Sequence, residues 1–155
     1  MTDRNVVHAT FTLERTYPAP PARVFAAWAT AEAKAQWFSG PEDWEQYERT
    51  LDFRPGGSER LRGRHPNGRV SDFDARYFDV IPDERIVYAY DMYSDGRKLS
   101  VSLATIEFKP APEGTRLVMT EQGAFLDGYD DAGRREHGTG VLLEWLGGAL
   151  ARQPG

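Results

Sequence analysis

Most of the chain alternates between apolar and polar residues, with turn residues at short intervals. His8–Tyr17 shows the pattern first, where Phe11 and Leu13 alternate with threonine and glutamate. A period of two residues predicts a β-strand with one buried face. Similar segments predict further strands at Trp44–Phe53, Ser58–His65, Val70–Val80, Arg85–Tyr93, Lys98–Lys109 and Thr115–Gln122. Tight turns such as Asn67-Gly68 separate them, which favours an antiparallel meander.

Two short stretches after the first strand follow a helical period instead. Val24, Phe25 and Trp28 recur at helical spacing, and Pro21 suits the first turn of such a helix. Thr30 predicts the N-cap of a second short helix, which the pattern extends to Trp37 and Phe38.

The last part of the chain predicts one long helix. Asp130 or Asp131 can cap it, and it extends to about Arg152. At ~1.5 Å per residue it is about 30 Å long, enough to cross a small domain. Its apolar stripe has i, i+3, i+4 spacing and consists of Gly138, Val141, Leu142, Trp145, Leu146, Ala149 and Leu150. We therefore expect an α+β fold in which a seven-stranded curved antiparallel sheet wraps around this C-terminal helix.

Composition and charge narrow the class of protein. The chain has 155 residues with no repeat or linker, which predicts a single domain over 1–155 with its core over 8–152. A net charge of −5 argues against nucleic acid and anionic membranes as partners. No apolar run approaches the roughly 20 residues that span a bilayer. The opening MTDRNVVHAT lacks an apolar signal core, so we expect a cytoplasmic protein.

Residues for metal, cofactor or nucleophilic chemistry are not arranged in any known motif. The chain has no cysteine, and His8, His65 and His137 are far apart, without an H-E-x-x-H motif. Neither a G-x-S-x-G elbow nor a glycine-rich dinucleotide fingerprint is present. We expect no metal and no cofactor.

The candidate binding residues lie on strand faces that are apolar by alternation, and on the helix stripe. If these faces look toward the helix they line a cavity; the alternative is ordinary core packing. Buried tyrosines favour the cavity slightly, because a phenol needs a hydrogen-bond partner. The candidates are Trp37, Phe73, Tyr77, Tyr88, Tyr90, Met92, Met119, Glu121, His137, Val141 and Trp145.

Glu121 is the only carboxylate on these apolar faces. Burial raises the pKa of a carboxyl group unless the group is paired. Glu121 could orient a ligand or act as a general acid or base. The alternative is a structural pair with a tyrosine, an arginine or His137.

Two further segments allow more than one interpretation. Trp37, Phe38 and Trp44 flank Gly40-Pro41, where they could form a lid at the cavity entrance, a dimer patch or part of the core. Arg54-Pro55-Gly56-Gly57 is either a tight connection that bends the sheet or a phosphate nest, although the full phosphate-loop pattern is absent.

Five segments in this order resemble one family. They are PARVFAAWATAEAKAQWF, LDFRPGG, FDARYFDVIPDERIVYAY, GTRLVMTEQGAF and REHGTGVLLEWLGGAL, and they span about Phe11 to Leu150. Together with the element order they resemble the helix-grip fold of the START-like or Bet v-like superfamily. Within it, the chain is similar to homologues of the activator of the heat-shock chaperone ATPase.

The resemblance implies a cavity between sheet and helix, which superfamily members use for lipids, sterols, polyketides or hormones. The leading hypothesis is a non-catalytic domain that binds a small hydrophobic molecule, such as a lipid or an aromatic, polyketide-like compound. The second is a module that docks on a chaperone or another protein, as the family's namesakes do, and the resemblance also allows a homodimer. The third is a cyclase or hydrolase that uses Glu121.

Overall fold

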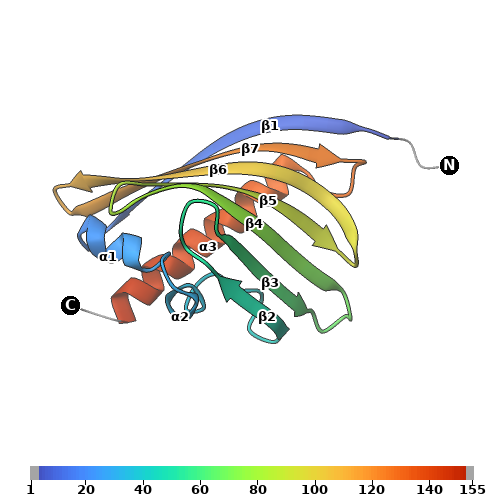
Figure 1. Ribbon diagram of the computed structural model, residues 1–155, viewed down its shortest axis with the longest axis horizontal. Helices are drawn as coiled ribbons and strands as arrows, with labels where there is room; N and C mark the ends of the chain where they lie inside the picture. Colours follow the sequence, from blue (N-terminus) through green and yellow to red (C-terminus); the bar gives the residue numbers. More distant parts are fainter. Residues whose placement is uncertain (1–3, 153–155) are drawn as a thin grey trace.

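The structure is a computed structural model that describes residues 4–152. A long curved sheet and a C-terminal helix dominate it, and two short helices lie beside the C-terminal half of the long helix (Figure 1). The predicted limits at residues 1 and 155 lie outside the described residues. In chain order the elements are β1 (Val6–Tyr17), α1 (Pro21–Ala26), α2 (Ala31–Lys34), β2 (Glu45–Leu51), β3 (Ser58–Arg64), β4 (Val70–Ile81), β5 (Arg85–Ser94), β6 (Arg97–Ala111), β7 (Gly114–Leu126) and α3 (Ala132–Arg152).

The seven strands form one antiparallel sheet in the order β1-β7-β6-β5-β4-β3-β2. Strands β2 to β7 are a meander, and β1 pairs with β7 at the far edge, with Phe11 opposite Glu121. The sheet curves over α3, which crosses beneath it (Figure 1). This confirms the predicted seven-stranded helix-grip architecture.

Glycines permit the tight connection between β2 and β3. Gly56 has a φ of +84°, a region that side chains with a Cβ rarely enter. Its N–H donates to the Tyr77 carbonyl at 2.8 Å, and the Tyr77 N–H donates to the Gly57 carbonyl at 2.9 Å. The segment is therefore held against β4 by backbone hydrogen bonds, as the structural interpretation of these glycines predicted.

The helix starts agree with the sequence signals. The Thr30 hydroxyl accepts a hydrogen bond from the Ala33 N–H at 3.1 Å and caps α2. Asp131 caps α3 by accepting from the Arg134 N–H at 2.9 Å. The end of α2 was predicted too late, because the helix stops at Lys34 and turns carry the chain to Phe38.

The core lies between the concave face of the sheet and the buried side of α3. Leu143 and Leu146 are almost fully buried, and the Tyr17 hydroxyl of β1 donates to the Leu143 carbonyl at 2.7 Å. The predicted inward faces of β4 and β5 are buried as well. Within residues 4–152, no helix is both long enough and apolar enough to span a membrane.

Candidate functional site

A cavity of about 680 Å³ lies between the sheet, the N-terminal half of α3 and the loop before β2. Its floor is formed by inward side chains of three strands, and most of these are aromatic or sulfur-containing. The floor residues are Phe73 on β4, Tyr88, Tyr90 and Met92 on β5, and Met119 on β7. The floor of the cavity is therefore part of the hydrophobic core.

Helix α3 provides the opposite wall through Gly138, Val141, Leu142 and Trp145. A Cβ atom added at Gly138 would meet nothing within 4 Å, so this position borders open space. Trp145 is 42% exposed. The wall thus extends from the protein interior to its surface.

The loop between α2 and β2 forms the rim, and Trp44 is its main side chain. A Cβ atom at Gly63 would lie 2.1 Å from the Trp44 ring, and one at Gly40 would lie 2.4 Å from it. Real side-chain atoms do not approach so closely, so the indole packs where both residues lack a side chain. Phe38 and Trp44 both line the cavity.

One end of the cavity is polar and is centred on Glu121, which is 1% exposed. The Tyr90 hydroxyl donates to Oε2 of Glu121 at 2.8 Å. Arg135 donates through Nη1 to the Tyr90 hydroxyl at 2.8 Å and lies 3.5 Å from the same carboxylate oxygen. These contacts join β5, β7 and α3 at one point.

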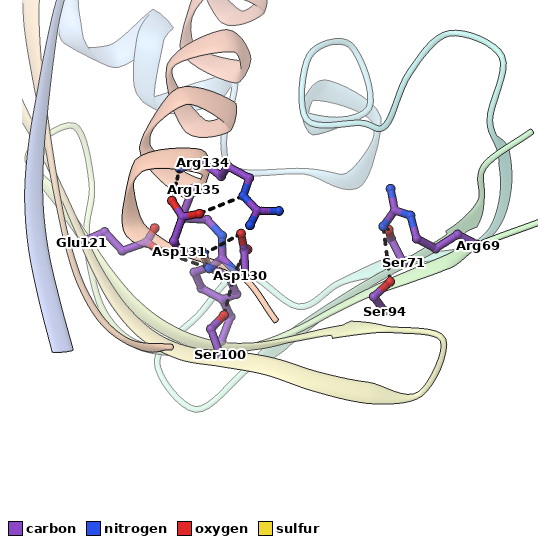
Figure 2. A network of polar contacts seen from close by, with 10 residues as sticks. Arg69, Ser71, Ser94, Ser100, Glu121, Asp130, Asp131, Arg134 and Arg135 are labelled. Carbon is purple, nitrogen blue, oxygen red and sulfur yellow. Dashed lines mark hydrogen bonds and ion pairs between the residues drawn. The ribbon is translucent and has the colours of Figure 1, made fainter. Parts of the chain in front are cut away.

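Arg135 also binds strand β6 and the residue Asp130 just before α3. Its Nη2 donates to the Ser100 hydroxyl at 2.7 Å and to the Asp130 carboxylate at 3.0 Å. Figure 2 shows Arg135, Asp130, Ser100 and Glu121 grouped beneath the start of α3. The guanidinium group therefore fixes the first turn of α3 to β6 and holds one wall of the cavity in place.

Burial raises the pKa of Glu121 above its ordinary value, while Arg135, Tyr90 and Ser102 act in the opposite direction. Burial likewise raises the pKa of Tyr90, which keeps the phenol protonated as a donor. Oε1 of Glu121 has no hydrogen-bond partner among residues 4–152, although it is buried. The polar end of the cavity is thus incompletely satisfied by the protein itself.

The other expected residues separate into two groups. Those in the cavity wall are Phe73, Tyr88, Tyr90, Met92, Met119, Glu121, Val141 and Trp145. Trp37, Tyr77 and His137 are not among the residues that line the cavity. Trp37 is core, because its Nε1 donates to the Ala27 carbonyl at 2.9 Å. Tyr77 lies deeper than the floor, where its hydroxyl donates to Glu59 at 2.6 Å.

His137 is exposed on α3 and does not approach Glu121. Successive residues of a helix are separated by about 100°, so His137 faces away from Arg135 two residues earlier. The partner of Glu121 is therefore an arginine and a tyrosine, both of which the sequence interpretation had allowed. Arg135 itself was missed, although it precedes Gly138 by three residues and Leu142 by seven on the same stripe.

A second polar cluster, also missed, lies beside the cavity on the same concave face of the sheet. Lys34 is fully buried, and its Nζ lies 2.7 Å from Oε1 of Glu59. The ammonium group also lies 4.1 Å from the centre of the Phe38 ring, a cation–π contact. Burial lowers the pKa of Lys34, and Glu59 opposes this effect. The cluster ties α2 to β3 without reaching the cavity.

Within residues 4–152, no three histidine, aspartate or glutamate side chains are grouped so that they could hold a metal ion.

A curved antiparallel sheet closed by a C-terminal helix over an apolar chamber defines a helix-grip protein. The family model described as "Activator of Hsp90 ATPase homolog 1-like protein" matches residues 18–151, and the chain belongs to this family. Comparison with curated proteins found no match.

Solved structures from several bacteria share the fold. A protein of Rhizobium leguminosarum is 45% identical, with a TM-score of 0.93, and the alignment covers 98% of this chain and 100% of that one. A protein of Rhizobium loti is 44% identical, with a TM-score of 0.87 and coverage of 94% and 99%. An AHSA1-like protein of Aeromonas hydrophila, 18% identical with a TM-score of 0.74 and 93% coverage of both chains, shares the fold.

Proposed function

We propose that this protein binds a small hydrophobic molecule in the cavity between the sheet and α3, without catalysing a covalent change. The observation that carries the proposal is an aromatic-floored chamber of about 680 Å³ that extends from the core to the surface at Trp145. Ligand sites in proteins have volumes of about 300–1,000 Å³ and combine apolar walls with a few polar groups. In this cavity, Glu121, Tyr90 and Arg135 supply the polar groups.

The energetics of the chamber suit a ligand of moderate size. Burial of about 300 Å² of apolar ligand surface contributes roughly 7 kcal/mol at about 25 cal/mol per Å². Lost translational and rotational freedom opposes this gain. A lipid or an aromatic, polyketide-like molecule has enough apolar surface to leave a net favourable balance.

Native mass spectrometry of the purified protein tests the proposal, because it reports the mass of a co-purified ligand and the number of subunits. In parallel, titration with the neutral apolar dye Nile red measures the capacity of the chamber. Val141→Trp places a bulky indole in the chamber from its helix wall. Glu136→Trp adds the same side chain at an exposed position of the same helix and is the matched control.

We expect saturable dye binding to the wild type and to Glu136→Trp, and binding at least about tenfold weaker to Val141→Trp, a difference of roughly 1.4 kcal/mol. Circular dichroism of each variant checks that it is folded. Equal dye affinity for all three folded proteins would show that the dye binds elsewhere, and the chamber would lose its proposed role.

A second candidate is docking on a chaperone or another protein, which the description of the family supports. The rim loop with Trp44 is the surface we would test. Addition of the protein to a purified Hsp90-type chaperone should raise its ATPase rate, and Trp44→Ala should reduce the effect. An unchanged ATPase rate argues against chaperone stimulation, and an unchanged effect of Trp44→Ala argues against this loop.

A further inference from the structure

The carboxylate of Glu121 uses only one of its two oxygens. Both protein donors, the Tyr90 hydroxyl and Arg135, approach Oε2. Oε1 accepts no hydrogen bond from any group within residues 4–152 and is shielded from solvent. Because buried acceptors in folded proteins are nearly always paired, this oxygen indicates a missing donor.

The position of Glu121 shows where that donor can come from. Glu121 lies in the cavity wall, together with Met119 and the phenol of Tyr88. A hydrogen-bonding interaction with the Ser102 hydroxyl lowers the pKa of Glu121, but within the described chain neither the Ser102 oxygen nor Oε1 of Glu121 has a partner at ordinary hydrogen-bond geometry. Ser102 is not part of the cavity wall, whereas Glu121 is.

The surrounding charges restrict the chemistry of the donor. A ligand ammonium group would be placed near the Arg135 guanidinium, which lies 3.5 Å from Oε2 of Glu121. A ligand carboxylate would bring a second acceptor to a site where Glu121 and Asp130 already hold Arg135. A neutral hydroxyl group supplies a proton to Oε1 without either conflict.

We propose, on the basis of the ligand-binding function above, that the molecule held in the chamber is an apolar alcohol or phenol whose hydroxyl group donates to Oε1 of Glu121. Tyr90 and Arg135 hold the carboxylate through Oε2, so that Oε1 remains available. The apolar body of the ligand lies on Phe73, Met92 and Met119, and the hydroxyl group fixes its orientation. Hydrocarbons and ethers of the same shape lack the donor and bind more weakly.

Three matched probes test this preference: para-phenylphenol, para-methoxybiphenyl and biphenyl. They share an apolar body and differ in the group offered to Glu121. Each probe is titrated against the Nile red complex, and its dissociation constant follows from displacement of the dye. We expect the phenol to bind the wild type about tenfold or more tightly than the ether, since hydrogen bonds to charged groups are stronger than neutral ones.

Glu121→Gln separates the hydrogen bond from general packing. The amide oxygen takes the place of Oε2, because Tyr90 and Arg135 both donate there, and the amide NH₂ then occupies the place of Oε1. The site changes from acceptor to donor, so the phenol should lose its advantage over the ether. Ser102→Ala removes the protein hydroxyl that acts on the same carboxylate and should retain the preference of the wild type; loss of the preference in this variant would assign it to Ser102 and contradict the proposed contact. Circular dichroism checks that each variant is folded, and Nile red displacement shows that its chamber is open.

The outcomes distinguish this inference from the function on which it rests. If the phenol and the ether bind the wild type equally well, the chamber is a binding site but the hydroxyl preference is wrong. A preference that survives in Glu121→Gln would likewise overturn the role of Glu121. If neither Nile red nor any probe binds the wild type, the binding function itself fails, and the inference fails with it.

Discussion

Two carboxylates, Glu59 and Glu121, are buried in different ways, and the difference decides what each can do. Glu59 is 2% exposed, and its Oε1 accepts hydrogen bonds from both the Lys34 ammonium, at 2.7 Å, and the Tyr77 hydroxyl, at 2.6 Å. In Glu121 both contacts go to Oε2, and Oε1 is buried without a partner within residues 4–152. The first group is therefore a structural ion pair, and the second is a site with capacity for one more hydrogen bond.

Removal of one member of the buried ion pair should be costly. Lys34→Met leaves the Glu59 carboxylate without its charge partner, and we expect a loss of about 3–5 kcal/mol in the free energy of unfolding. Urea denaturation measures it. The double variant with Glu59→Gln should recover part of this loss, because no uncompensated charge remains. Losses that simply add would contradict direct coupling of the two side chains.

Glu121 should make stability depend on pH in an unusual direction. Its pKa is raised in the folded protein, so the folded state binds the proton more tightly than the unfolded state does. Its contribution to stability is therefore complete below the unfolded pKa, near 4.5, and is lost as the pH rises through the folded pKa.

The measurement is the difference in unfolding free energy between the wild type and Glu121→Gln, followed by urea denaturation from acid to neutral pH. The wild type should lose stability relative to the variant as the pH rises, with a slope of at most about 1.4 kcal/mol per pH unit. A difference that grows in favour of the wild type over this range would show that Arg135 outweighs burial.

At the scale of elements, the two halves of α3 have different roles. Its C-terminal half packs on the sheet through Leu143, Leu146 and Leu150. Its N-terminal half borders the cavity and is fixed at its first turn by Arg135. Glycines occur in both halves but have different neighbours, so their replacement should have different effects.

Gly138→Ala and Gly147→Ala form a matched pair on this helix. Alanine gains up to about 1 kcal/mol of helix propensity over glycine. At Gly138 the added Cβ meets nothing within 4 Å, so we expect that gain in unfolding free energy. At Gly147 it lies 3.3 Å from the Tyr17 ring, which is anchored by its hydrogen bond to Leu143. Thermal unfolding should show a smaller gain or a loss there, and equal gains would refute the packing argument.

The elements themselves were largely predictable, because alternation and turn residues are local properties of the sequence. The caps at Thr30 and Asp131 were visible for the same reason. The end of α2 was not, since the apolar residues Trp37 and Phe38 continue a helical spacing while the chain has already turned. Apolar spacing shows which side of a segment is buried, but it does not fix where the backbone leaves the helix.

The candidate site was less predictable, because its polar end depends on contacts between distant segments. Arg135 is a charged residue near a helix start, where sequence alone favours exposure. Arg135 becomes part of the cavity wall through its contacts with Tyr90, 45 residues away, and with Glu121, 14 residues away. Lys34 is similar, since nothing local indicates its pairing with Glu59.

At the scale of the whole molecule, the chamber is an unfilled part of the core. A ligand that occupies it binds the folded state only, so it should stabilise the protein as a whole. At a ligand concentration one hundred times the dissociation constant, the gain is about 2.7 kcal/mol. For a domain of this size that corresponds to a rise of roughly 5–10 °C in Tm.

Differential scanning fluorimetry with para-phenylphenol measures this shift. Val141→Trp is the control, because an obstructed chamber should show a smaller ligand-dependent rise in Tm. A rise of the same size in that variant would place the stabilising interaction on another surface of the protein.

The pairing of β1 with β7 has a consequence for biosynthesis. Phe11 of β1 can pair with β7 only after Glu121 has left the ribosome. The β1 edge of the sheet therefore forms late in synthesis. Helix α3, which roofs the chamber, is translated later still. The aromatic floor, which is complete once Met119 has been made, therefore stays uncovered until α3 has been made, and closure of such long-range contacts is slow. The cavity can therefore first retain a ligand only when α3 has packed onto the sheet, which is a late step of folding.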